Sequence, residues 1–272
     1  MIYCDKAIKE DNNSQEAFFV KGQALHLLKK DEKALEAYQK AIDIDSKVAD
    51  YFVFKARSLV ILEKHQEAAD TYQKAIELQP DTIDYYVNKA KSLYKLGKYA
   101  EAANNYQAAI NLKANVAEYH ANMAQALSMM GNHERAIIEY QGALGLNPNN
   151  ADYYVNMAQS FYELGRYIDA AYAYQDAIKI NPNNADYHTN RALSFYRLKD
   201  YLKAIKSYEE AIRLNPNNPD YHVYEAKCYS ASWEYSRAIR AYRKAIDLNP
   251  KNIHNWECKI ICVRGQNKQR MM

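Results

Sequence analysis

The chain has no apolar segment of the length that a membrane-spanning helix needs. Its first residues, MIYCDKAIKEDN, also lack the apolar core of a secretory signal peptide. Cysteine is scarce, and the four residues Cys4, Cys228, Cys258 and Cys262 form no disulfide framework, which fits a reducing compartment. We therefore expect a cytoplasmic protein that does not contact membranes.

An excess of charge of one sign is also missing. The chain has 36 Lys and Arg against 33 Asp and Glu, a formal net charge of +3. A balance this close to neutral does not favour nucleic acid as a partner. Basic side chains do gather toward the C-terminus, where they form either a solvated helix face or a binding patch. They are Arg191, Arg197, Lys203, Arg213, Arg237, Arg240 and Arg243.

Sequence signatures of catalysis are absent. No glycine-rich phosphate loop and no serine of a nucleophile elbow occur, and the residues after His133-Glu134 do not complete a zinc-protease motif. His254, Cys258 and Cys262 are spaced so that one helix face could present them to a soft metal. Simple packing is the alternative explanation for these cysteines. We therefore expect no enzyme activity, no cofactor and no bound metal.

The chain does contain a repeat of 34 residues. Residues 151–184 align on residues 185–218 without a gap, and the same register continues in both directions. A period of this length is typical of a solenoid, in which each unit buries its apolar face against its neighbours. The seven full copies are 15–48, 49–82, 83–116, 117–150, 151–184, 185–218 and 219–252. Residues 1–14 fit the second helix of a partial repeat, and residues 253–272 fit a C-terminal half-repeat helix.

Each copy predicts two amphipathic helices, at about positions 2–14 and 18–31 of the repeat. Position 8 is glycine or alanine, positions 20 and 27 are alanine, and position 24 is tyrosine in every copy. The small residues let the two helix backbones approach each other, and the aromatic residues fill the space around them. Proline at position 32 ends the second helix, asparagine next to it suits an N-cap, and an acid at position 2 suits the following helix N-terminus.

This pattern resembles the tetratricopeptide repeat family over essentially the whole chain. The resemblance implies an all-α fold, an α-solenoid in which antiparallel helix pairs form a right-handed superhelix. The first helices of the pairs would line its concave side. His120, His188 and His222 occupy position 4, where other copies carry an aromatic residue. We expect these histidines to be partly buried packing residues rather than ligands or bases.

Asparagine at position 6 of four consecutive copies is the candidate binding feature. A side-chain amide both donates and accepts hydrogen bonds, so a row of amides could pair with successive peptide groups of an extended chain. The row resembles the asparagine ladder in the repeats of O-linked N-acetylglucosamine transferase, although asparagine is also common at this position of the repeat generally. The four residues are Asn88, Asn122, Asn156 and Asn190.

Other positions on the same helix face add polar and aromatic candidates. Tyrosine at position 12 offers contact area and a hydroxyl group at low entropic cost. The further candidates are Lys91, Gln125 and Gln159 at position 9, Tyr94, Tyr162 and Tyr196 at position 12, and Lys95 and Arg197 at position 13. A two-carboxylate clamp, a second binding mode of the family, is not expected, because position 5 is largely apolar and position 2 is acidic.

These features predict a non-catalytic protein–protein interaction scaffold that binds an extended or helical segment of a partner protein in the concave groove. The alternative is the substrate-recruiting repeat arm of a larger transferase enzyme whose catalytic domain is not in this chain. Ile260, Ile261 and Val263 make the C-terminal half-repeat apolar, which leaves open a weak homodimer through a terminal repeat.

Overall fold

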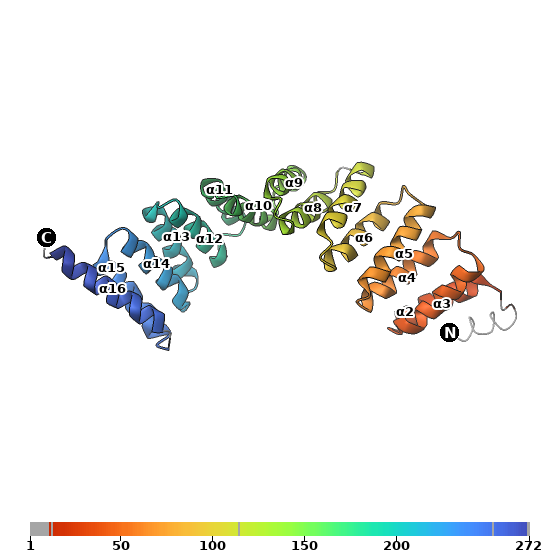
Figure 1. The fold of residues 1–272 in the computed structure, drawn as a ribbon, viewed down its shortest axis with the longest axis horizontal. Helices are drawn as coiled ribbons and strands as arrows, with labels where there is room; N and C mark the ends of the chain where they lie inside the picture. The colour runs from red at the N-terminus through yellow and green to blue at the C-terminus, as the bar shows by residue number, and fades with distance from the viewer. Residues whose placement is uncertain (1–10, 12, 114, 252, 271–272) are drawn as a thin grey trace. The chain divides into compact units, whose positions relative to one another are not determined.

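The computed structural model describes residues 11, 13–113, 115–251 and 253–270. These residues form α-helices joined by short turns, and no strand occurs among them. The chain divides into two compact units, one ending at Leu146 and one beginning at Asn147. Within each unit, consecutive helices lie side by side in pairs (Figure 1).

The first unit contains α2 to α9 and the second contains α10 to α16. The helices of the first unit are α2 (Gln15–Leu27), α3 (Asp31–Ile44), α4 (Ala49–Ile61), α5 (His65–Leu78), α6 (Ile83–Lys95), α7 (Tyr99–Leu112), α8 (Ala117–Met129) and α9 (His133–Leu146). Those of the second are α10 (Ala151–Glu163), α11 (Tyr167–Ile180), α12 (Ala185–Arg197), α13 (Tyr201–Leu214), α14 (Pro219–Ala231), α15 (Tyr235–Leu248) and α16 (Ile253–Arg270).

The prediction of an all-α array of helix pairs is confirmed. Both helices of each copy begin one residue earlier than the sequence pattern predicted. The predicted half-repeat helix at the N-terminus lies almost entirely outside the described residues. Ser14 is described, and it caps α2, because its hydroxyl group accepts a hydrogen bond from the Ala17 backbone N–H at 3.3 Å.

The recurring small residues are buried between the helices, as the sequence pattern predicts. Alanine at positions 20 and 27 of every copy, and at position 8 of every copy but the first, has 0% exposure, and the tyrosine at position 24 is at most 2% exposed. Helix backbones can approach only where the side chain between them is this small. The aromatic rings then fill the volume on either side, so buried alanine and tyrosine recur together in every copy.

The turn between the two helices of each copy has a left-handed residue at position 15. Glycine occupies it in three copies, with φ between 72° and 76° at Gly165, Gly97 and Gly131. The other four copies hold a residue with a side chain in the same conformation, at Lys29, Glu63, Lys199 and Trp233. This conformation is strained for any residue other than glycine, and it persists because the packed helices on both sides fix the turn.

The histidines at position 4 are packing residues, but two of them are more deeply buried than predicted. His188 is 6% exposed and His222 is 7% exposed. Nε2 of His188 lies 3.0 Å from the carbonyl oxygen of Pro182, and a carbonyl can only accept, so this nitrogen carries the proton. His120 is half-buried, and its Nδ1 lies 2.8 Å from a carboxylate oxygen of Glu139.

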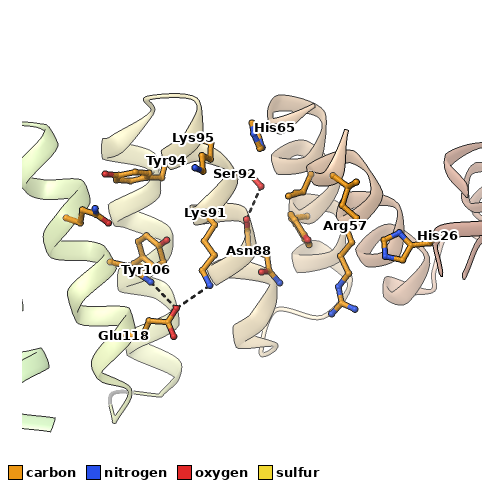
Figure 2. Close-up of a pocket in the computed structure, with 15 residues that line it drawn as sticks. His26, Arg57, His65, Asn88, Lys91, Ser92, Tyr94, Lys95, Tyr106 and Glu118 are labelled. Atoms are coloured by element: carbon orange, nitrogen blue, oxygen red, sulfur yellow. Dashed lines mark hydrogen bonds and ion pairs between the residues drawn. The ribbon is translucent and has the colours of Figure 1, made fainter. Parts of the chain in front are cut away.

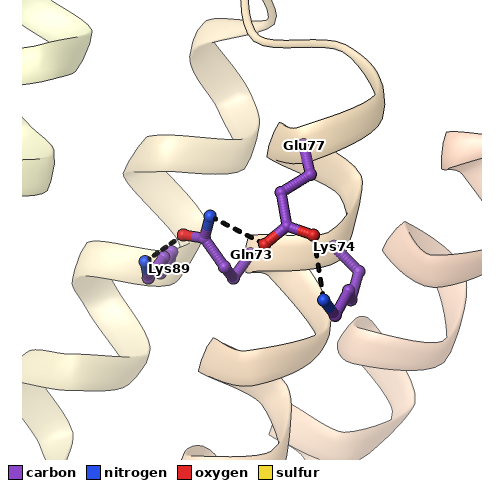
Figure 3. A network of polar contacts seen from close by, with 4 residues as sticks. All are labelled: Gln73, Lys74, Glu77 and Lys89. Atoms are coloured by element: carbon purple, nitrogen blue, oxygen red, sulfur yellow. Dashed lines mark hydrogen bonds and ion pairs between the residues drawn. The ribbon is translucent and has the colours of Figure 1, made fainter.

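A polar network joins α5 to α6, and Figure 3 shows its four side chains. The Lys89 amine, at position 7, donates to Oε1 of Gln73 at 2.5 Å. The Gln73 amide donates to Glu77 at 3.3 Å, and Glu77 also pairs with Lys74 at 2.9 Å. The same contact between position 7 and the glutamine at position 25 of the preceding copy recurs at Lys55 and Gln39, 2.5 Å apart, and at Arg191 and Gln175.

The hydrogen bond from Lys89 to Gln73 predicts that Gln73→Ala destabilises the protein by about 1–2 kcal/mol, because the half-buried Lys89 amine loses its acceptor. Gln107→Ala is the matched control. Gln107 has the same place in its copy, but the following copy holds Met123 at position 7, which has no N–H to donate. The control is expected to change stability by less than about 0.5 kcal/mol. Urea denaturation followed by circular dichroism measures both, and equal losses would contradict the prediction.

Candidate functional site

Half of the predicted binding residues surround one cavity in the first unit. The cavity has a volume of about 730 Å³ and lies along α4, α6 and α8, the first helices of three successive copies (Figure 2). The 34-residue register places equivalent positions of these helices next to one another, which is why residues far apart in sequence share one surface. The predicted residues that line the cavity are Asn88, Lys91, Tyr94, Lys95, Asn122 and Gln125.

A carboxylate of the chain itself lies at this site. Glu118 stands at position 2 of α8, in the first turn of the helix. Its Oε1 lies 3.3 Å from the Lys91 amine and 3.4 Å from Nδ2 of Asn122. Figure 2 shows the Lys91 side chain extended from α6 toward Glu118. Two of the predicted binding residues are therefore already engaged by one acid.

Several cavity residues were missed by the sequence analysis. Arg57 and Ile61 come from α4, His26 from α2 and His65 from α5. Three of them stand at positions 9, 13 and 12, on the same helix face as the candidates, but in the first two copies, where no asparagine drew attention to them. His65, in the first turn of a second helix, had no signal in the sequence.

Arg57 is held against aromatic rings. Its guanidinium lies 5.1 Å from the centre of the Phe54 ring, and its side chain hydrogen-bonds the Tyr72 hydroxyl group. Burial raises the pKa of Tyr72 to about 12, and the Arg57 charge only partly opposes this rise. Tyr72 therefore stays neutral at physiological pH. Its hydroxyl group does not neutralise the positive charge of Arg57.

His26, Asp31 and Ser58 form a cluster beside the cavity, but they are not arranged as a catalytic triad. Nδ1 of His26 lies 2.7 Å from Asp31 Oδ1 and 3.0 Å from Ser58 Oγ. In a triad the acid and the serine contact opposite nitrogens of the ring, so that a proton can pass between them. Here both contact the same nitrogen, and Ser58 is fully buried. The cluster holds α2, α3 and α4 together.

Three of the four predicted asparagines have side-chain amides with no hydrogen-bond partner among the described residues: Asn88, Asn156 and Asn190. Their backbone carbonyls each accept a bond from the serine one turn later; Ser92 donates to Asn88 at 3.0 Å. This bond uses the main chain and leaves the amide available. Whether the row binds a peptide, as a ladder would, stays a prediction.

The tyrosines at position 12 are half-buried and pack against a tyrosine at position 17 of their own copy. The ring centres are 5.1 Å apart for Tyr94 and Tyr99 and 5.7 Å apart for Tyr196 and Tyr201. Burial raises the pKa of Tyr94 and of Tyr196. Each ring therefore packs across the turn between the two helices of its copy and stays partly exposed.

The other predicted residues lie in the second unit, where they are less concentrated. Tyr196 and Arg197 line a smaller cavity of about 210 Å³, and Arg197 donates to the Tyr162 hydroxyl group at 2.8 Å. Gln159 accepts a bond from the Tyr174 hydroxyl group at 3.4 Å. Asn156 and Asn190 do not line this cavity. The predicted row of asparagines is thus divided between the two units.

The cysteines of α16 do not form a metal site in the part of the chain that is described. Cys262 is buried, its sulfur lies 3.5 Å from the Ser230 hydroxyl oxygen, and burial raises the pKa of its thiol. The side chain of His254 lies outside the described residues. Among the side chains described, no three His, Cys, Asp or Glu residues converge as metal ligands would. None of the described helices has the length and apolar character that crossing a membrane requires.

Sequence comparison finds the same repeat along most of the chain. A tetratricopeptide repeat model matches residues 155–219, a TPR repeat model matches 56–97, 90–131 and 129–165, and a further tetratricopeptide repeat model matches 219–252. A model of anaphase-promoting complex, cyclosome, subunit 3 matches residues 1–75. No curated protein matches the chain.

Solved structures have the same fold at low sequence identity. The C-terminal part of a TPR repeat-containing protein from Cytophaga hutchinsonii is 17% identical, with a TM-score of 0.75 over 88% of this chain and 98% of that one. YrrB, described as a TPR protein with an unusual peptide-binding site, is 24% identical, with a TM-score of 0.59 over 66% of this chain and 92% of that one. A chain of Naa15/Naa10 bound to HypK-THB is 15% identical, with a TM-score of 0.63 over 92% of this chain and 39% of that one.

The buried alanine seams, the paired helices and these matches define an α-helical repeat protein. The chain belongs to the tetratricopeptide repeat family. This repeat fold is typical of proteins that serve as scaffolds for protein–protein interaction.

Proposed function

We propose that this chain is a non-catalytic interaction module that binds an extended segment of a partner protein along its first helices. The observation that carries the proposal is the cavity of about 730 Å³, which has Asn88, Lys91, Tyr94, Asn122 and Gln125 in its walls. Amides, an amine and aromatic edges on one concave surface suit a peptide, whose backbone offers donors and acceptors at every residue.

The proposal predicts that changing Asn88, Asn122, Asn156 and Asn190 together to alanine abolishes partner capture. Each neutral hydrogen bond contributes only about 0.5–1.5 kcal/mol, so a single change is expected to weaken binding several-fold at most. The protein is immobilised, exposed to cell lysate, and the retained proteins are identified and quantified. Circular dichroism of the variant checks that its helix content is unchanged.

Two double variants separate the contributions of the two units. Asn88→Ala with Asn122→Ala alters the first unit, and Asn156→Ala with Asn190→Ala alters the second. Asn104→Ala with Asn111→Ala is the matched control, because both are exposed on α7 and neither lines the cavity. If the variant with all four changes captured the same partners at similar strength, the proposal that partners bind on the first helices would be wrong.

A further inference from the structure

The cavity of the first unit has an unbalanced set of charges. Arg57, Lys91 and Lys95 bring three positive charges to its wall, while Glu118 is the one carboxylate that lines it among the described residues. Neither Arg57 nor Lys95 has a carboxylate partner among the side chains described. Lys95 follows Lys91 by one helical turn, about 6 Å along the axis, so the two amines face the cavity one above the other. The surface is therefore complementary to negative charge.

Glu118 shows where a carboxylate sits at this surface. Its oxygen accepts from the Lys91 amine at 3.3 Å and from the Asn122 amide at 3.4 Å. The pair is loosely held, since the side chains of Lys91 and Glu118 are 53% and 59% exposed, and an exposed ion pair of this kind contributes little to stability. An acid from a partner could replace Glu118 on both donors at small cost.

Apolar contacts lie next to the charges. Ile61 is 58% exposed beside Val60 on the α4 side of the cavity, and the rings of Tyr94 and Tyr106 also line the cavity. An aliphatic side chain of a bound segment would cover Ile61 while neighbouring acids reached the amines. This combination favours a segment in which acidic and aliphatic residues are mixed.

We infer that the cavity of the first unit binds an acidic segment of a partner protein, and that Glu118 occupies the place of one of its carboxylates until the segment binds. The inference rests on the proposed function and adds to it the chemistry of the partner. It differs from a carboxylate clamp at positions 2 and 5, because its cations stand at positions 9 and 13.

Three labelled peptides of equal length test the charge preference on the full chain. In the first, glutamate and leucine alternate; glutamine replaces glutamate in the second, and lysine replaces it in the third. Fluorescence anisotropy is expected to show binding of the first peptide, at least about tenfold weaker binding of the second and none of the third. Raising the salt concentration from about 0.05 M to about 0.3 M is expected to weaken binding of the first peptide several-fold.

Variants of the cavity residues are expected to shift the affinity in opposite directions. Glu118→Gln frees Lys91 and Asn122 and is expected to tighten binding of the glutamate peptide about two- to fivefold. Arg57→Gln with Lys95→Gln is expected to weaken it about tenfold, while Arg57→Lys, which keeps the charge, retains most of it. Lys74→Gln is the matched control, because it removes one positive charge from α5 outside the cavity.

The inference is wrong if the glutamine or lysine peptide binds as well as the glutamate peptide, if no peptide binds, or if Glu118→Gln weakens binding. The proposed function can survive each of these results. A different result contradicts the proposed function: proteins from the lysate are still captured after all four asparagines are changed to alanine. A glutamate peptide whose binding is insensitive to salt would also contradict the inference, while an uncharged row of amides would remain compatible with that result.

Discussion

Gly22→Ala is expected to destabilise the first repeat by about 2 kcal/mol. A Cβ atom at this position would lie 2.4 Å from Cε1 and 2.6 Å from Cδ1 of the Tyr38 ring, far inside van der Waals contact. Overpacking of this kind costs about 1–3 kcal/mol and occasionally more. Alanine would return about 1 kcal/mol of helix propensity in the interior of α2, so the steric cost must exceed that gain.

The ring cannot simply move away. Tyr38 is fully buried, and the rings of Phe19 and Phe54 stand 6.0 Å and 6.2 Å from it. The later copies carry alanine at position 8 together with tyrosine at position 24, and all of them have a smaller residue where Phe19 stands. Where Phe54 stands they have asparagine or cysteine, except that Tyr224 stacks on Tyr208. Only the first copy has an aromatic ring at both places, and Phe19 and Phe54 together confine the Tyr38 ring over Gly22.

Urea denaturation, with hydrogen exchange of α2 and α3 as the local readout, measures the effect. Gly145→Ala is the matched control, because outside its own helix no described atom lies within 4 Å of the place that the added Cβ would take. This change is expected to stabilise α9 by about 1 kcal/mol. Adding Phe54→Asn to Gly22→Ala is expected to reduce the cost, because the ring regains room. Equal costs with and without Phe54 would show that this ring does not confine Tyr38.

His26→Leu is expected to cost about 2–3 kcal/mol. Asp31 is only 3% exposed, and its carboxylate has His26 as its one hydrogen-bond partner among the described side chains, at 2.7 Å. Without the imidazole, a buried charge would remain at the start of α3, where the helix N-terminus offsets only part of the penalty. Ser58 can adapt, because serines at its position in other copies bond a backbone carbonyl.

His65→Leu is the matched control for this prediction. His65 contributes to the same cavity, but its buried Nδ1 has no hydrogen-bond partner within the described part of the chain. Replacing it removes no bond of that nitrogen, and the change in stability is expected to stay within about 0.5 kcal/mol. Asp31→Asn should cost less than His26→Leu, and the double variant should lose less than the sum. Additive losses in urea denaturation would show that the two residues do not act as a pair.

Much of the repeat could be predicted from local sequence. Asn150, Asn184 and Asn218 cap the following helices, each accepting a bond from the backbone N–H two residues later at 3.0 Å, because the residues involved are neighbours in the chain. Alanine at positions 20 and 27 is buried for an equally local reason, since the helical period fixes which face it occupies.

The candidate site could be predicted only in part. Asn88, Lys91 and Asn122 were found because they recur at fixed positions of the repeat. The engagement of Lys91 and Asn122 by Glu118 could not be predicted, because it depends on how far the side chains of two copies extend toward each other. The packing of the tyrosines at position 12 on a tyrosine of their own copy could not be predicted either, because it depends on the directions of two side chains across a turn. Their contact with a partner stays a prediction.

The sequence by itself determined the class of protein, the helix pairs and the face of each first helix, because a strict 34-residue period repeats the same local rules in every copy. The tertiary structure decided which copies form the cavity, that Arg57 and Ile61 share it with Lys95, and that the Tyr38 ring lies directly against Gly22. These features arise where the copies depart from their consensus. They depend on the volume and direction of particular side chains, which a repeat pattern does not encode.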